Sequence, residues 1–330
     1  MFRVGVGRDL RGGDGLAVHD LALDLLDDAA GVEWGFLPEH GPELSPAAIA
    51  GFDAIMIWEP GGITAATLAG ADRLRLIARF GMGLDAIDLA ACAERGVMVS
   101  VAPDSVSTSV PTAAIALLLS LAHRLPEKDR LVREGRWEER SECVGLGTVG
   151  RTLGVIGAGN VGSAVLRMAE PFGLVPLAFD PHVHTHPHEL PAATEEVDLA
   201  TLLRRSDFVV VACSLDARTR GLIDADALAL MAPHAYLVNI ARGAIVDDLA
   251  VAAAIAEGRL AGAALDVFDP EPIAPGHPLL DLPQTILTPH GASYTSASLR
   301  RLGATACAAV LAVARGEEPA HLVGAEPDAR

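Results

Sequence analysis

A glycine-rich turn directly after an apolar run constrains the fold of this chain more than any other feature. The run Leu153–Ile156 leads into GAGNVG at residues 157–162, and a helix-like apolar segment follows. A strand, a G-x-G-x-x-G turn and a helix form the first βα unit of a dinucleotide-binding sheet. Gly157 permits the tight turn, Gly159 lets the backbone approach a pyrophosphate, and Gly162 lets the helix pack closely on the strand. The pattern predicts a Rossmann nucleotide site.

An acidic residue follows this turn at the expected spacing. Asp180 lies 18 residues after Gly162, at the end of the next apolar run. A carboxylate at this place accepts hydrogen bonds from ribose hydroxyls and repels a 2′-phosphate. Because no Arg or Lys occurs in the next four residues, PHVH, the sequence favours NAD over NADP.

Apolar runs alternate with helical patterns along most of the chain. Six runs predict the strands of a Rossmann sheet, at residues 152–156, 174–179, 208–213, 235–240, 261–266 and 285–288. The first hundred residues repeat the rhythm on a smaller scale, with strands expected at 3–7, 54–58 and 74–80 and helices at 19–30 and 87–95. Longer helices are expected at 107–124, with Pro111 in the first turn, and at 296–314.

We therefore predict an α/β protein of two domains, because 330 residues exceed what one hydrophobic core accommodates. Residues 101–295 form an NAD-binding Rossmann domain. Residues 1–100 and 296–330 form a smaller, flavodoxin-like parallel-sheet substrate domain, with a cleft between the two. Since 51% of residues are hydrophobic and only 4% are aromatic, the core must consist mainly of Ala, Val, Leu and Ile, which suits buried parallel strands.

Charge and hydropathy argue against several kinds of partner. The formal net charge of −18 would repel a nucleic acid or an anionic membrane surface. The longest apolar stretch, residues 113–122, is about half of the roughly 20 residues that span a bilayer, so we expect no transmembrane helix. The first residues lack the apolar segment of a secretory signal, and the four cysteines form no CxxC pair. We expect a cytoplasmic protein with reduced thiols.

Four histidines alternate after the predicted second Rossmann strand, at residues 182, 184, 186 and 188. In an extended segment they would share one face and could bind a metal ion. Pro181 and Pro187 favour a surface loop instead. We predict a loop without a metal site.

Arg242, Glu271 and His290 follow successive predicted strands, at the edge where such sheets bind ligands. The fork of Arg242 can hold the carboxylate of a 2-keto acid and polarise its carbonyl. His290 can donate a proton near neutral pH, and Glu271 can orient the imidazole and favour its protonated form. Each residue alone has a structural explanation, as a helix cap, a solvated loop residue or a turn residue. Their joint occurrence favours a catalytic trio.

Five stretches give the chain a resemblance, over nearly its whole length, to the D-isomer-specific 2-hydroxyacid dehydrogenase family. These are ARFGMGLDAIDL at 78–89, RTLGVIGAGNVG at 151–162, LVNIARGAIVDDLAV at 237–251, ALDVFDPEP at 264–272 and LTPHGASYT at 287–295. The resemblance implies the same roles for the trio, NAD as cofactor, and a homodimer formed through residues 101–140. It also implies that closure of the cleft excludes water.

The resemblance further implies which residues contact the ligands. The backbone N–H groups of Met82 and Gly83 would bind the substrate carboxylate, and Asp266 would contact the nicotinamide carboxamide. The full cofactor set that we expect is Gly157, Gly159, Asn160, Val161, Gly162, Asp180, Cys213, Ser214, Thr219, Ile240, Ala241, Arg242, Asp266, His290 and Ser293.

The segment IWEP at 57–60 departs from the family pattern, because phosphoglycerate dehydrogenases carry a basic residue there. Trp58 could pack against an apolar substituent of the substrate or simply fill the core. We predict an enzyme that interconverts an unphosphorylated 2-keto acid, similar to glyoxylate or hydroxypyruvate or bulkier, with the D-2-hydroxy acid. The alternatives are a phosphoglycerate dehydrogenase, a non-catalytic NAD(H)-sensing protein like the corepressors of this fold, and, with less support, a formate or phosphite dehydrogenase.

Overall fold

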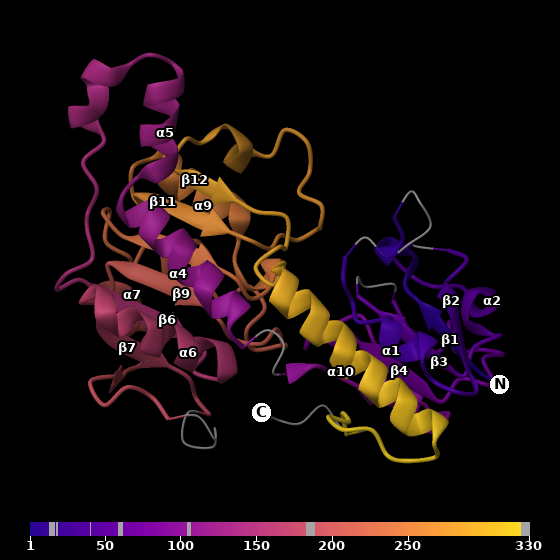
Figure 1. The fold of residues 1–330 in the computed structure, drawn as a ribbon. Coiled ribbons are helices and arrows are strands. Elements are labelled where there is room, and N and C mark those ends of the chain that lie inside the picture. Colours follow the sequence, from indigo (N-terminus) through magenta and orange to yellow (C-terminus); the bar gives the residue numbers. More distant parts are fainter. Residues whose placement is uncertain are drawn as a thin grey trace. The chain divides into compact units, whose positions relative to one another are not determined.

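The chain folds into two compact units, each built on one parallel β-sheet (Figure 1). The structure is a computed structural model and describes residues 1–12, 17, 19–39, 41–58, 62–103, 107–182 and 189–324. Unit 1 comprises Met1–Val106 and Tyr294–Arg330, and unit 2 comprises Ser107–Ser293. Two parallel sheets covered by helices confirm the predicted α/β class.

Unit 1 contains a five-stranded sheet in the order β2-β1-β3-β4-β5, which is the flavodoxin-like order. The strands are β1 (Phe2–Val6), β2 (Val32–Phe36), β3 (Ala54–Ile57), β4 (Leu76–Arg79) and β5 (Met98–Ser100). The helices are α1 (Asp24–Asp27), α2 (Pro46–Ile49), α3 (Leu89–Glu94), α10 (Ser296–Ala314) and the 3₁₀ turn η1 (Arg8–Leu10). Helix α10 returns from the far end of the chain to pack on β4, where its apolar side shares a core with β1 and β3.

Unit 1 differs from the sequence prediction at β2, β5 and α1, and the short helix α2 was not predicted either. The strands β2 and β5 were not expected, because β2 contains Glu33 and Gly35 and β5 is only three residues long. Of the helix expected at 19–30, only α1 forms. Ala22 has a left-handed backbone conformation, with φ of 55°, and a right-handed helix cannot pass through it.

By length and composition alone, helix α10 is long and apolar enough to span a membrane. The helices α4 (Ser109–Ala122) and α5 (Leu125–Arg133) reach the same length and hydropathy only when they are taken together as one bent pair. In α10, 56% of the most apolar window is buried inside the protein. Its buried residues, such as Leu302 and Val310, lie in the core of unit 1. That burial is the pattern of a core helix.

Unit 2 contains a seven-stranded sheet in the order β12-β11-β10-β9-β6-β7-β8. The strands are β6 (Thr152–Ile156), β7 (Val175–Phe179), β8 (Glu195–Glu196), β9 (Phe208–Val211), β10 (Tyr236–Asn239), β11 (Gly262–Leu265) and β12 (Thr285–Leu287). Its remaining helices are α6 (Asn160–Ala169), α7 (Leu199–Arg205), α8 (Ala225–Leu228) and α9 (Asp248–Ala256), with 3₁₀ turns η3 (Trp137–Glu142), η4 (Glu170–Phe172), η6 (Gly243–Ile245) and η7 (Pro278–Asp281). The six predicted strands are present. A seventh strand, β8, was not predicted, because it does not lie in an apolar run.

Both faces of this sheet are covered. Along β9, Val209 and Val211 point to the core formed with α7, α8 and α9, while Phe208 and Val210 point to the core formed with α4 and α6. The chain begins the sheet at β6, adds β7 and β8 on one side, and then crosses to β9 on the other. The strand order therefore reverses between β6 and β9, and the carboxyl ends of these two strands form the topological switch point, where doubly wound sheets bind ligands.

Candidate active site

The glycine turn lies at the switch point and requires glycine at two positions. Gly157 has a left-handed φ of 91°, and a Cβ there would lie 2.5 Å from the Cα of Cys213. A Cβ on Gly162 would lie 1.8 Å from the carbonyl oxygen of Gly157, so only glycine lets α6 approach the turn this closely. Gly159 precedes the first residue of α6. The N-terminus of α6 thus begins in a tight backbone cradle of the kind that binds a pyrophosphate.

Asp180 lies directly against this cradle. One carboxylate oxygen, Oδ2, accepts the N–H of Ala158 at 2.8 Å, and the other, Oδ1, accepts the N–H of His182 at 2.8 Å. The carboxylate therefore stands beside the glycine turn at the carboxyl end of β7, where a ribose binds in this fold. The other histidines of the alternating tract lie outside the described residues.

The loop after β9 contributes three of the predicted cofactor residues. Burial raises the pKa of the Cys213 thiol to about 12, and the charges of Asp180 and Asp216 add to this effect, so the thiol stays protonated at neutral pH. The Thr219 hydroxyl donates to the Ser214 carbonyl at 2.7 Å and accepts the N–H of Asp216 at 2.8 Å. Thr219 therefore closes the loop on itself.

Arg242 follows β10 on a loop that a buried amide holds in place. Asn239 donates from Nδ2 to the Arg242 carbonyl at 2.9 Å and accepts the N–H of Ala241 at 3.1 Å. The guanidinium itself donates to the Ala241 carbonyl at 2.7 Å. Ile240 is buried beside this loop. Asn239 was not predicted as a site residue, although a polar residue at the end of an otherwise apolar strand is a signal that could have identified it.

Gly243 brings the arginine loop against the loop that carries Glu271. A Cβ on Gly243 would lie 1.9 Å from the backbone carbon of Phe268. Only glycine therefore allows this close approach of the two backbones.

Glu271 and His290 form a hydrogen-bonded pair. The distance between His290 Nδ1 and Glu271 Oε2 is 2.9 Å, and Glu271 Oε1 accepts the N–H of Phe268 at 2.9 Å. The bond to Glu271 is the main reason that the pKa of His290 is raised, and it outweighs both burial and the repulsion from Arg242. Burial alone would raise the pKa of Glu271, but the bonds to His290 and Phe268 and the charge of Arg242 lower it. The pair therefore favours an imidazolium beside a carboxylate.

Asp266 anchors the loop that carries His290. Its carboxylate is almost fully buried, with 1% of the residue exposed. Oδ1 accepts the Thr288 hydroxyl at 2.5 Å and the Gly291 N–H at 2.9 Å, and Oδ2 accepts the Ala292 N–H at 2.9 Å. Its backbone carbonyl accepts the N–H of His290, which has a left-handed φ of 50°. The predicted contact of Asp266 with a nicotinamide stays a prediction, whereas its part in fixing this loop was missed.

Two other members of the expected cofactor set, Asn160 and Val161, begin α6. Ser293 ends unit 2. Among the described residues, no cluster of three or more His, Cys, Asp or Glu side chains could hold a metal ion.

Three of the predicted substrate residues, Trp58, Met82 and Gly83, belong to unit 1, whereas Arg242 belongs to unit 2. Trp58 is only 8% exposed and stacks on Phe80 at 5.9 Å between ring centroids, while Tyr294 meets it edge-on at 5.1 Å. Its ring thus fills the core, which is one of the two roles expected for it. Met82 is 46% exposed, and the carbonyl of Gly83 accepts a hydrogen bond from Arg79 Nε at 2.9 Å.

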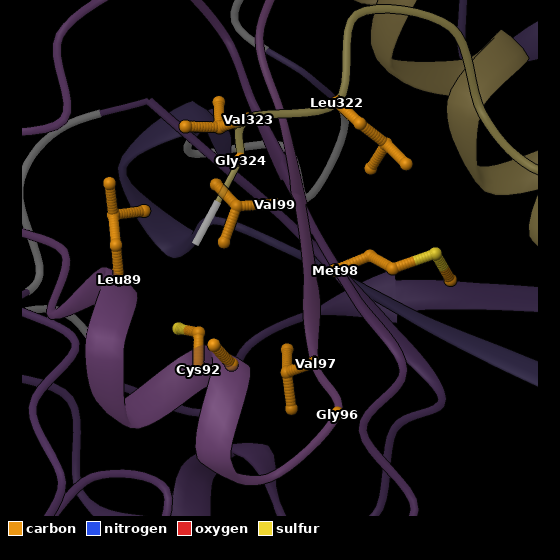
Figure 2. Close-up of a pocket in the computed structure, with 10 residues that line it drawn as sticks. Leu89, Cys92, Gly96, Val97, Met98, Val99, Leu322, Val323 and Gly324 are labelled. Atoms are coloured by element: carbon orange, nitrogen blue, oxygen red, sulfur yellow. The ribbon is translucent and has the colours of Figure 1, made fainter. Parts of the chain in front are cut away.

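A separate cavity of about 230 Å³ lies in unit 1 between α3, β5 and the segment 322–324 (Figure 2). Its lining is apolar, with Leu89, Cys92, Val97 and Val99 among the side chains that face it. It contains none of the predicted site residues.

The trio, the glycine cradle and Asp180 all follow carboxyl ends of strands in one parallel sheet, so they share one edge of unit 2. The edge thus carries a backbone cradle shaped for a pyrophosphate together with an imidazole, a carboxylate and a guanidinium. These are the features of an NAD(P)-dependent oxidoreductase.

Known proteins agree with this class. The glyoxylate reductase of Korarchaeum cryptofilum is 37% identical over 277 residues, which cover 83% of each chain. The D-3-phosphoglycerate dehydrogenase of Mycobacterium tuberculosis is 37% identical over 292 residues, which cover 88% of this chain and 54% of that protein. The chain therefore spans about half the length of this second relative.

Solved structures show the same architecture. The TT0316 protein of Thermus thermophilus matches with a TM-score of 0.85 and 33% identity, covering 98% of this chain and 100% of that one. An NADPH-dependent glyoxylate/hydroxypyruvate reductase of Sinorhizobium meliloti matches with a TM-score of 0.81 and 27% identity, covering both chains fully.

The family model for the D-isomer-specific 2-hydroxyacid dehydrogenase NAD-binding domain matches residues 115–292. The chain belongs to this family and is an NAD(P)-dependent 2-hydroxyacid dehydrogenase.

Proposed function

We propose that this protein reduces an unphosphorylated 2-keto acid to the D-2-hydroxy acid with NADH, and catalyses the reverse reaction with NAD. The observation that carries the proposal is the 2.9 Å hydrogen bond between His290 and Glu271. It lies on the edge of the sheet that also carries Arg242 and the glycine cradle. The parts needed to bind a keto acid and to protonate its oxygen therefore share one edge.

Each member of the trio has one task in the reduction. Bound NADH supplies the hydride to the carbonyl carbon. Arg242 binds the substrate carboxylate and polarises the carbonyl, because its fork donates two parallel hydrogen bonds. His290 gives the proton from Nε2 to the oxygen as negative charge develops there, and becomes neutral. Glu271 holds Nδ1–H, which leaves Nε2 as the proton donor.

The substrate class rests on unit 1 and on the relatives. The relatives carry the names glyoxylate reductase and D-3-phosphoglycerate dehydrogenase at equal identity. We favour an unphosphorylated substrate because Trp58 follows β3, at the place where, by the family resemblance, phosphoglycerate dehydrogenases carry a basic residue. By the family resemblance, Met82 and Gly83 bind the substrate carboxylate through their N–H groups.

A panel of keto acids tests this assignment. Steady-state kcat/KM with NADH would be compared for glyoxylate, hydroxypyruvate, pyruvate, a branched keto acid and phosphohydroxypyruvate. We expect one of the first four to give the highest value. Preference for phosphohydroxypyruvate would support the phosphoglycerate dehydrogenase alternative, and tight NADH binding without turnover of any keto acid would support the sensing protein.

We propose NAD rather than NADP as the cofactor. The Asp180 carboxylate lies within 2.8 Å of the Ala158 N–H, beside the position of the adenosine ribose in this fold. Its negative charge would repel a 2′-phosphate. Titration of NADH and NADPH fluorescence on the protein tests this, with tighter NADH binding expected.

We also propose a homodimer formed through residues 101–140. Helix α5 and η3 expose large apolar side chains, with Leu125 50%, Val132 60% and Trp137 60% exposed. A second copy of the chain would bury them. Sedimentation of the wild type and of Trp137→Glu tests this, since the substitution should shift a dimer toward monomer.

A cytoplasmic location is proposed from cysteine usage. All four cysteines are free, and Cys92, Cys143 and Cys307 are buried. Free thiols persist in a reducing compartment.

A further inference from the structure

An arginine from the loop after β9 reaches the loop after β7. Arg218 Nη1 lies 3.3 Å from His182 Nε2, although the two residues are 36 positions apart in the sequence. The strands β7 and β9 flank β6 on either side, so this contact spans the end of the strand that carries the glycine turn. Because Asp180 binds the N–H groups of Ala158 and His182, the guanidinium lies at the adenosine end of the nucleotide site.

The four residues directly after Asp180, on which the preference for NAD was based, include no Arg or Lys. In doubly wound folds an arginine near the ribose is what accommodates a 2′-phosphate. Arg218 supplies such a group from a different loop. Its side chain is 64% exposed, so it can turn toward a ligand.

The Arg218 guanidinium is paired with the Asp216 carboxylate. Its Oδ2 accepts Arg218 Nη2 at 2.7 Å and Nε at 3.1 Å. The hydrogen bond to Arg218 is the main reason that the pKa of Asp216 is lowered, to about 2, so this carboxylate is charged throughout the usual assay range. Asp180 and Asp216 also both act on the Cys213 thiol, so two carboxylates and one guanidinium lie in this part of the site, and its local charge is negative.

We propose that Arg218 is the residue that determines specificity at the 2′ position of the dinucleotide. While Arg218 is paired with Asp216, the net charge beside the ribose is negative and favours NAD(H). Released from Asp216, Arg218 binds the 2′-phosphate of NADP(H) through its fork. This inference rests on the proposed use of NAD(H) and adds the group that sets the preference.

Asp216→Asn releases Arg218 with little other change. Asp216 Oδ1 accepts the N–H groups of Arg218 at 2.7 Å and Thr219 at 3.0 Å, and the amide oxygen of Asn keeps both bonds. The amide nitrogen replaces Oδ2 and does not pair with a guanidinium. The loop is therefore preserved while the ion pair is lost.

The experiment measures dissociation constants of NADPH and NADH by fluorescence for the wild type, Asp216→Asn, Arg218→Ala and the double variant. Asp216→Asn should tighten NADPH relative to NADH by about tenfold, the size expected for one new charge-assisted hydrogen bond. In the Arg218→Ala background the same substitution should give no such gain. Arg220→Ala, which removes a positive charge from the same loop, should leave the NADPH-to-NADH ratio of wild type within about twofold.

Two outcomes would overturn the inference. An equal gain with and without Arg218 would mean that the charge of Asp216 acts alone, because coupling between the two residues would then be zero. An unchanged ratio in Asp216→Asn would mean that Arg218 does not reach the 2′ position. If the wild type binds neither NADH nor NADPH, the proposed function itself fails, and this result is distinct from both.

Discussion

Replacing Glu271 by Gln tests how the trio works, because an amide cannot accept both of the hydrogen bonds that this carboxylate accepts. Glu271 accepts two hydrogen bonds, from the Phe268 N–H and from His290 Nδ1, each at 2.9 Å. A Gln side chain has one acceptor oxygen and one donor nitrogen. If the oxygen keeps Phe268, the amide N–H faces Nδ1, and Nδ1 must become an acceptor. His290 is then held as a neutral imidazole and is a weaker acid.

The expected loss of rate follows from this change. General acid catalysis by a positioned side chain contributes about 10²–10⁴-fold. Because the side chains of His290 and Glu271 are 42% and 34% exposed, solvent screens the pair and the lower end of that range applies. We expect kcat/KM for keto acid reduction to fall about 10²-fold at neutral pH.

The pH profile tests the direction of the effect of Glu271 on His290 independently of the size of the rate loss. Glu271 raises the pKa of His290, so the protonated acid persists to higher pH than an isolated histidine would allow. In Glu271→Gln the alkaline limb of kcat/KM for reduction should therefore move to lower pH. Glu257→Gln, which alters an exposed carboxylate paired with Arg259, is the matched control. A profile with an unmoved alkaline limb and kcat/KM within about threefold of wild type would refute the role of Glu271.

Three further substitutions probe the other parts of the site. Arg242→Lys should lower kcat/KM about 10²-fold in steady-state assays, because lysine keeps the charge but loses the fork. Gly162→Ala should lower the free energy of unfolding by about 3 kcal/mol and abolish NADH binding, since its Cβ would lie 1.8 Å from the Gly157 carbonyl oxygen. Asp266→Asn should cost about 1–3 kcal/mol in urea unfolding and also reduce kcat, because an amide N–H would face the Ala292 N–H.

Each of these has a contrary outcome. Full activity of Arg242→Lys would mean that a point charge suffices to bind the substrate. Unchanged NADH binding in Gly162→Ala would show that the close approach of α6 is dispensable. An Asp266→Asn protein with wild-type stability and kcat would show that the His290 loop holds its conformation without this carboxylate.

Features set by neighbouring residues could be predicted from the sequence. The strand, glycine turn and helix at 152–169 follow one another directly, so Gly157, Gly162 and Asp180 were identified from spacing alone. Helix α10 was also predicted with its observed bounds, because its apolar pattern runs unbroken from Ser296 to Ala314. The positions of Arg242, Glu271 and His290 after strand ends also followed from the apolar runs, whereas their catalytic roles stay predictions.

Features set by contacts between distant segments could not be predicted. The strand β8 consists of two exposed glutamates and exists only because it pairs with β7. Asp266 anchors residues 22 to 26 positions away, and Arg218 meets His182 across another strand. No local pattern signals these partners, since they meet only when the sheet has formed.

The stereochemistry of the product is the sharpest test of the proposed D-specific reduction by His290. Wild-type protein would be incubated with NADH and hydroxypyruvate, and the glycerate formed would be separated by chiral chromatography, with His290→Ala in parallel. We expect NADH oxidation to be matched by formation of D-glycerate, and the rate to be at least about 10²-fold lower in His290→Ala. Formation of L-glycerate, or a His290→Ala protein as active as wild type, would contradict this expectation.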